Sequence, residues 1–230
     1  MQNASYVILF VSRNKDNENV AQFKSRRRAF LWNQPTLPIK RFESFVAEGV
    51  PGEVCRMYQS VNARNVEKVR KALIVKLVTA DTMDLTKIEG IVASLAALSE
   101  NKAESKWLFD FDSTDENKQE VFYEDLRKLL VESYKGTPLE KTAEIVTSKT
   151  PNGMHYIIPR GVDTRELLKK WEDTVTLKRD DMRIVAIQRK RLPCLVHLWF
   201  YDIICIDWGA SGKPKDLMEK ARAPWSPFIL

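Results

Sequence analysis

An aromatic residue stands at every second position of the segment WLFDFD, residues 107–112. Successive side chains of a β-strand point to opposite faces, so this alternation indicates a half-buried strand. The aromatic side chains then share the face toward the core, while Asp110 and Asp112 share the other face. The sequence therefore predicts a strand that presents two carboxylates in one direction.

The residues after this strand predict a regular succession of further elements. An apolar stripe at helical spacing indicates a helix, and an Asn-Gly pair marks the tight turn of a hairpin. The resulting order of strand, helix, strand, strand, helix, strand is the ferredoxin/RRM-like split βαβ arrangement, so we predict an α+β fold. The expected elements are a helix at about 115–134, hairpin strands at 143–148 and 154–159, a helix that begins after Asp163, and a strand at 174–178.

Several chemically active side chains converge in a sheet of this order. Right-handed connections place its first and third strands side by side at the centre, with the fourth strand beside the first. His155 belongs to the third strand, and Asp180 and Asp181 follow the fourth. We therefore expect these residues to meet Asp110 and Asp112 on the sheet face that the helices leave uncovered.

The paired strand carboxylates favour a divalent cation. Two aspartates on one half-buried face repel each other, and burying an unpaired charge costs several kcal/mol. Mg²⁺ or Mn²⁺ removes both penalties, and carboxylate oxygens are the ligands that these ions prefer. We predict a metal site formed by Asp110, Asp112 and the acidic pair Asp180 and Asp181. The alternative is that Asp110 forms a salt bridge and Asp112 only opens the following loop.

His155 and its neighbours suggest a place for an anion beside that metal. A single histidine in a sheet is more often a structural residue than a catalytic one. Here, however, it follows a turn that contains Lys149, with Ser148 just before it. Hydroxyl, ammonium and backbone N–H groups could therefore surround a phosphate. We predict that Ser148, Lys149 and His155 bind a nucleotide.

A second group of basic residues closes this part of the chain. Arg189, Lys190 and Arg191 follow the strand-like segment 182–187. They are predicted to contact a triphosphate or a template backbone, with a solvated surface as the alternative. The basic run at 26–28 allows the same two interpretations.

The first hundred residues predict a scaffold. A strand is expected at 6–11 and helices at 65–78 and 84–102. We divide the chain into an N-terminal α/β scaffold, residues 1–105, an RRM-like palm, residues 106–191, and an extension, residues 192–230, that packs on the core.

Composition narrows the classes of function. The chain has 230 residues, a formal net charge of +6, two histidines and three cysteines without a CxxC pair. This excludes a three-histidine zinc site and gives no disulfide framework, which favours a reducing cytoplasm. The apolar stretches at 6–11 and 192–208 are too short for a signal peptide or a bilayer span, so no membrane association is expected. The basic balance permits a nucleic-acid partner.

These motifs together resemble the archaeo-eukaryotic primase superfamily, the primase-polymerases. In that family a strand ends in D-x-[DE], a hairpin carries [ST]-x-H, and a later strand supplies a third acid. WLFDFD is similar to the first motif and TSKTPNGMHYIIP to the second, through Ser148 and His155, although the spacing between hydroxyl and histidine is longer here. The third acid would be Asp180 or Asp181, which lie in RDDM rather than in an apolar strand.

The resemblance implies a metal-dependent nucleotidyltransferase that acts on nucleoside triphosphates and a nucleic-acid strand. The aspartates Asp110 and Asp112, with one later acid, would hold two Mg²⁺ or Mn²⁺ ions, while His155 and nearby basic residues would hold the triphosphate. DNA replication is the implied process. The chain, which has few linkers, also resembles bacteriophage proteins in style, so the cytoplasm would be that of a host cell.

Two other classes of function remain open. LFDFDST also resembles the D-x-D-x-[TV] motif of haloacid dehalogenase phosphatases, with Asp110 as nucleophile, Asp112 as acid and base, and Thr114 adjacent. Lys178 or Lys149 and the later acidic pair would complete that site, but the motif should then open a parallel sheet.

The other alternative is a non-catalytic module that binds nucleic acid or a protein partner on the same fold. Such sheets bind single-stranded RNA by stacking bases on exposed aromatic residues. The face with Leu108, Asp110 and His155 offers a poor aromatic platform.

Overall fold

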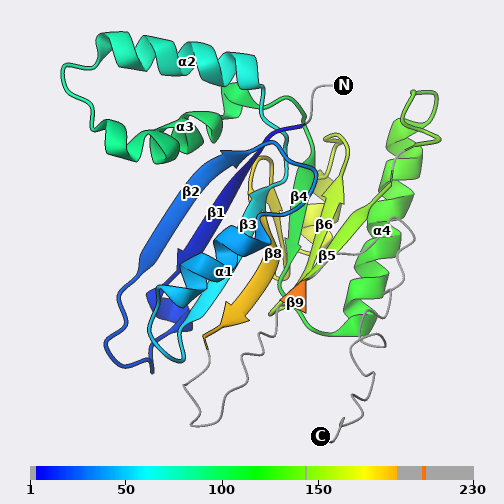
Figure 1. The fold of residues 1–230 in the computed structure, drawn as a ribbon. Helices are drawn as coiled ribbons and strands as arrows, with labels where there is room; N and C mark the ends of the chain where they lie inside the picture. Colours follow the sequence, from blue (N-terminus) through cyan, green and yellow to red (C-terminus); the bar gives the residue numbers. More distant parts are fainter. Residues whose placement is uncertain (1–3, 143, 191–203, 206–230) are drawn as a thin grey trace, which may run out of the picture.

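The chain forms an α+β fold with two antiparallel sheets (Figure 1), seen in a computed structural model that describes residues 4–142, 144–190 and 204–205. No helix in these residues is both long and apolar enough to cross a membrane. The strands are β1 (Tyr6–Ser12), β2 (Arg26–Trp32), β3 (Val54–Ser60), β4 (Trp107–Phe111), β5 (Val146–Thr150), β6 (Gly153–Ile158), β7 (Val175–Lys178), β8 (Met182–Arg189) and β9 (Ile204–Cys205). The α-helices are α1 (Ile39–Ala47), α2 (Val66–Thr79), α3 (Ile88–Ala96), α4 (Glu116–Tyr134) and α5 (Arg165–Lys170).

The first sheet has the strand order β2-β1-β3-β8-β9. Helix α1 crosses one of its faces (Figure 1), because Phe42, Phe45 and Val46 form an apolar stripe that packs on Phe10 and Phe30. Helices α2 and α3 form a hairpin at one end of the sheet. Three of its strands, β1, β2 and β3, come from the first 105 residues, where the sequence predicted only one strand.

One expected helix of this scaffold is shorter than predicted. The segment 84–102 divides into a short 3-10 turn, α3 and a second 3-10 turn. Leu98 has extended backbone angles, and the side chain of Asn101 donates to the carbonyl of Leu95, so the helix cannot continue.

The second sheet has the order β5-β6-β4-β7, and every neighbouring pair is antiparallel. The first and third strands of the predicted succession, β4 and β6, therefore lie side by side, with the fourth, β7, beside the first. Helices α4 and α5 pack on one face of this sheet. Their contacts are with the aromatic side of β4, through a core that includes Phe109, Phe111, Phe122, Leu126 and Tyr156.

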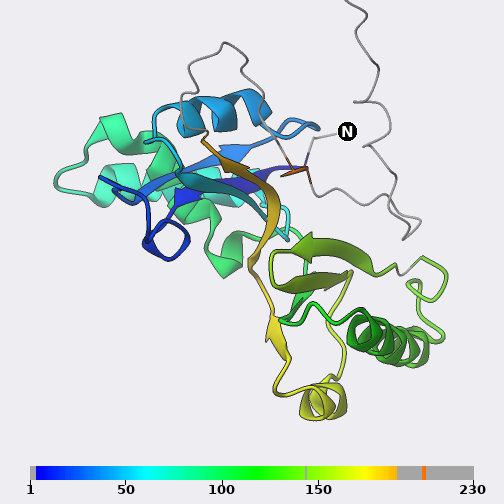
Figure 2. The same cartoon turned by 90° about the horizontal axis from the view of Figure 1, so that it is seen from below.

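Strand β8 belongs to the first sheet. It follows β7 after a short turn but pairs with β3 from Val54–Arg189 to Ser60–Met182. The sequence had grouped this strand with the palm, residues 106–191, so that grouping is wrong for residues 182–189. Figure 2 shows β7 running into β8 where the two sheets meet. Of the expected extension, residues 192–230, only β9 lies within the described residues, and it pairs with β8.

Apolar contacts and a hydrogen bond join the two sheets. Leu108 of β4 and Ile157 of β6 pack against Val61, which follows β3. Beside them, the Ser148 hydroxyl lies 3.5 Å from the carbonyl oxygen of Ile184 in β8. The face of the second sheet that lacks helices is thus partly covered by the first sheet.

Candidate active site at the junction of the sheets

Three strands place polar side chains in one row on the face without helices. Asp110 of β4 pairs with His155 of β6, and His155 pairs with Ser148 of β5. Residues directly opposite each other in a sheet point to the same side. Phe109 and Phe111 point to the α4 side, so the row faces the first sheet. The predicted meeting of Asp110 and His155 is present in the structure.

Both carboxylate oxygens of Asp110 contact a nitrogen. His155 Nε2 lies 3.2 Å from Oδ1, and Lys178 Nζ at the end of β7 lies 2.8 Å from Oδ2. The contact with His155 lowers the pKa of Asp110 most, burial opposes this, and Lys178 lowers it further, with a resulting pKa of about 2. The Asp110 side chain is 17% exposed. It is therefore an ionised, half-buried carboxylate at neutral pH.

Lys178 also contacts a second carboxylate. Its ammonium lies 3.3 Å from Oδ2 of Asp181, whose Oδ1 accepts from the backbone N–H of Met182. Burial lowers the pKa of Lys178, but Asp110 and Asp181 outweigh it and raise the pKa. The sequence considered Lys178 only for the phosphatase alternative. The predicted strand order could have placed Lys178 near Asp110, because β7 flanks β4. Lys178 is two residues from Thr176, the partner of Asp110, so it points to the same face.

Asp112 lies just beyond the end of β4 and is exposed. Its backbone N–H bonds to Thr174, which continues the pairing of β4 with β7. The hairpin turn lies against this strand end: a Cβ on Gly153 would come within 1.9 Å of the carbonyl oxygen of Phe111. Glycine at 153 therefore allows the turn to approach the acidic end of β4.

Asp180 does not join this site. Its carboxylate forms two hydrogen bonds of 3.0 Å with the guanidinium of Arg64, a side chain that is 3% exposed, and accepts a third from Asn62. The prediction of Asp180 as a metal ligand is not supported by this placement, because the carboxylate bonds to a buried arginine away from Asp110. Of the later acidic pair, only Asp181 reaches the Asp110 cluster.

The predicted nucleotide-binding residues of the hairpin separate onto two faces. Ser148 lies in the row beside His155 and is buried. Lys149 is the next residue of the strand, so it points to the opposite face, where it is exposed. The prediction that Lys149 lies with His155 is therefore wrong.

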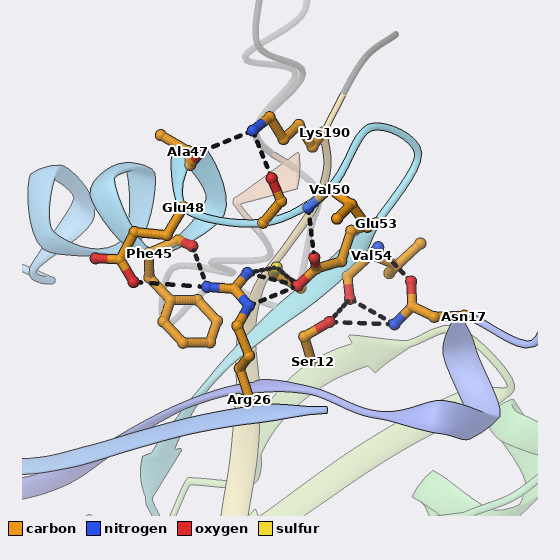
Figure 3. A network of polar contacts seen from close by, with 12 residues as sticks. Ser12, Asn17, Arg26, Phe45, Ala47, Glu48, Val50, Glu53, Val54 and Lys190 are labelled. Carbon is orange, nitrogen blue, oxygen red and sulfur yellow. Dashed lines mark hydrogen bonds and ion pairs between the residues drawn. The ribbon is translucent and has the colours of Figure 1, made fainter. Parts of the chain in front are cut away.

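The basic residues that close β8 lie far along the strand from Asp110. Arg189 pairs with Val54, at the opposite end of β8 from Met182 and its neighbour Asp181. The Lys190 ammonium donates to the carbonyl oxygens of Ala47 and Gly49, at 2.7 and 2.6 Å, which end helix α1 (Figure 3). The prediction that Arg189 and Lys190 contact the nucleotide is not supported by this placement, since Lys190 closes a helix end instead.

A polar network extends from that helix end (Figure 3). Arg26 of β2 donates to the side chain of Glu53, which is 1% exposed, and to the carbonyl of Phe45. Cys55 lies beside them, and burial raises its pKa to about 12, so it is a neutral thiol. Arg26 therefore has a structural role. The basic run at 26–28 is not a purely solvated surface, because Arg26 bonds to a buried carboxylate.

Acid should weaken this network. Burial raises the pKa of Glu53, but hydrogen bonds from Arg26 and the Val50 N–H outweigh it and lower the pKa below 4.5. A carboxyl whose pKa is lower in the folded than in the unfolded protein stabilises the fold at any pH above its unfolded pKa. This stabilisation is lost as the pH falls through the folded pKa. We expect Glu53→Gln to cost about 2 kcal/mol at about pH 7 and less at about pH 3. Urea unfolding at both pH values measures this, and an equal cost at both would contradict it.

The donor set is of the kind that a hard divalent cation prefers. Carboxylate oxygens of Asp110 and Asp181 already converge on one cation, the Lys178 ammonium. Asp112 lies at the adjacent strand end. Among the described residues there is no ready group of three His, Cys, Asp or Glu ligands. The residues fit Mg²⁺ or Mn²⁺ in their chemistry, and Lys178 holds the position between them.

The sheet that carries Asp110 is antiparallel on both sides of β4. The phosphatase alternative requires this strand to open a parallel sheet, so the geometry does not favour it. Comparisons of the chain with protein-family models, with curated proteins and with solved structures return no significant match.

Proposed function

We propose that this chain is a metal-dependent nucleotidyltransferase of the primase-polymerase type, acting on nucleoside triphosphates and a nucleic-acid strand. The strand order β5-β6-β4-β7, with α4 and α5 on one face, supports an RRM-like palm of the split βαβ kind. The first sheet would be the scaffold that covers part of the other face. The proposed setting is a reducing cytoplasm, that of a host cell if the chain is viral.

One observation carries the proposal: the 3.2 Å contact between Asp110 and His155 at the junction of the two sheets. It brings a cation-binding group and a phosphate-binding group to adjacent positions. Lys178 and Asp181 extend the cluster on the β7 side, and Asp112 extends it beyond the end of β4. Binding of a metal triphosphate needs an ionised acid for the cation and nitrogen donors nearby for the phosphate oxygens.

The reaction transfers a nucleotidyl group. The 3′-hydroxyl oxygen of the strand attacks the α-phosphorus of the triphosphate, the bond from that phosphorus to the bridging oxygen breaks, and pyrophosphate leaves with the bond electrons. The hydroxyl proton passes to water. A bound Mg²⁺ or Mn²⁺ would lower the pKa of the hydroxyl and neutralise the pyrophosphate.

The residues of the chain hold the reactants in place. Asp110, Asp112 and Asp181 would ligate the metal: Asp110 shares the Lys178 ammonium with Asp181 on one side, and Asp112 follows the end of β4 on the other. His155 donates from Nε2 to Asp110, which fixes the orientation of its ring. Its Nδ1 is buried without a hydrogen-bond partner among the described residues, and the hydroxyl of the neighbouring Ser148 is directed at the carbonyl of Ile184.

The test is a transfer assay with the full chain, Mn²⁺, a primed template and triphosphates labelled at the α-position. We expect label in a lengthened strand and release of unlabelled pyrophosphate. The same assay in EDTA should give no product. Label that stays in the triphosphate under all metal conditions would contradict the proposal.

The alternatives give different products. A phosphatase would release inorganic phosphate and form a beryllium fluoride adduct on Asp110. A binding module would retain a single strand with equal affinity in EDTA and in Mg²⁺, without any product. Either result would replace the proposed function.

A further inference from the structure

The ammonium of Lys178 occupies the position between two carboxylates of the site. It lies 2.8 Å from Oδ2 of Asp110, on β4, and 3.3 Å from Oδ2 of Asp181, in the turn between β7 and β8. Two acids from separate elements thus converge on one positive charge. That position is where electrostatics favours a cation.

Each oxygen of Asp110 already contacts a nitrogen. His155 engages Oδ1 and Lys178 engages Oδ2. A metal ion that binds Asp110 through Oδ2 must therefore replace the ammonium, because the two positive charges would repel each other at this distance. At the position between Asp110 and Asp181, Lys178 and a metal ion therefore compete.

The lysine can leave without moving the backbone. Lys178 is the last residue of β7, its side chain is 36% exposed, and its flexible four-carbon stem can turn toward solvent. His155, the other side chain in contact with Asp110, is in contrast only 6% exposed. Of these two side chains, Lys178 is therefore the one with room to turn away from Asp110.

We propose that Lys178 is an internal counter-ion that holds the carboxylates of the metal-free protein and is displaced when a divalent cation binds. This rests on the proposed function for its metal site. Without metal, the ammonium prevents Asp110 and Asp181 from repelling each other. With metal, the released ammonium lies beside the site as a free positive charge, available to phosphate oxygens of the triphosphate.

The first test measures Mn²⁺ affinity of the full chain without nucleotide, by electron paramagnetic resonance of free Mn²⁺. Removing the competing charge with Lys178→Met should tighten Mn²⁺ binding about tenfold or more, within the usual range of coupling between sites. Lys178→Arg keeps a cation and should bind close to wild type. The control Lys169→Met removes an exposed lysine of α5 and should change nothing.

The second test uses the unaltered protein, so it does not depend on the folding of a variant. The rate of reductive methylation of each lysine is measured by mass spectrometry in EDTA and in Mg²⁺. Lys178 should react several-fold faster in Mg²⁺, because its amine leaves the ion pairs. Lys169 should react equally in both.

The outcomes separate this inference from the proposed function. Equal or weaker Mn²⁺ binding by Lys178→Met, or a Lys178 methylation rate that Mg²⁺ leaves unchanged, would overturn the role of Lys178. If the wild type transfers nucleotides in that case, the proposed function stands. If neither the wild type nor Lys178→Met binds Mn²⁺, the metal site and the counter-ion role both fall.

Discussion

Asp110→Asn is expected to lower the rate of nucleotide transfer about 1000-fold, which corresponds to about 4 kcal/mol of transition-state stabilisation. Asparagine has nearly the same shape, and its one carbonyl oxygen can accept from either His155 or Lys178, so the pairing of β4 with β6 should persist. It lacks the negative charge on which the cation depends. The loss should therefore appear in turnover and in Mn²⁺ affinity, while circular dichroism and the midpoint of thermal unfolding stay close to wild type.

The matched control for this change is Asp163→Asn. Asp163 is an exposed aspartate that pairs with Arg165 at the start of α5, on the side of the sheet away from the row. Its removal should leave transfer unaffected. A fully active Asp110→Asn protein would remove Asp110 from the metal site. If the Asp110→Asn protein unfolds, Asp110 is instead a residue that stabilises the fold.

Asp180→Ala should destabilise the fold by about 3–5 kcal/mol, the usual cost of leaving a buried charge without its partner. Arg64 is 3% exposed and both of its terminal nitrogens bond to Asp180. Asn62, which accepts from and donates to the backbone of Lys106, also bonds to Asp180. The ion pair thus connects the start of α2, the approach to β4 and the turn after β7. Urea unfolding measures the loss.

A double substitution separates charge from packing. Replacing both partners, as in Arg64→Met with Asp180→Leu, removes the unpaired charge and should cost less than Asp180→Ala alone. Mn²⁺ affinity of the folded Asp180→Ala protein should equal that of the wild type, because Asp180 lies outside the Asp110 cluster. A large fall in Mn²⁺ affinity with unchanged stability would restore Asp180 as a ligand.

The second sheet could be predicted from sequence because its signals are local. The alternation of 107–112, the turn at 152–153 and the acid before α4 each act within a few residues. Asp115 accepts from the N–H groups of Asn117 and Lys118, as an N-cap should. The helix expected after Asp163 begins at Arg165: Thr164 precedes it without a side-chain cap, and Asp163 pairs with Arg165.

The first sheet was largely missed because its strands depend on distant partners. Strand β2 begins within a basic run, and β3 carries Arg56 in its interior. These arginines look like surface residues in the sequence. In the structure Arg26 bonds to Glu53, and Arg56 bonds to Asp16, 40 residues away. No pattern among neighbouring residues predicts ion pairs between such distant positions.

The candidate site could be predicted in its centre but not at its edge. The pairing of Asp110 with His155 follows from strand order alone. Which of Asp180 and Asp181 turns toward β4 depends on the geometry of a short turn and on Arg64, which lies 116 residues from Asp180. Consecutive residues after a strand point in different directions, so the sequence could not decide which of the two aspartates approaches Asp110. In the structure Asp181 does so, through Lys178.

The passage of the chain from β7 into β8 also decides how this protein could be divided. A fragment that stops before β4 would lack β8, so β3 would expose an open edge with unpaired backbone groups. A fragment that starts at β4 would carry β8 as a strand with no first sheet to receive it. Neither half is a self-sufficient folding unit, and genetic dissection of this chain calls for point substitutions rather than truncations.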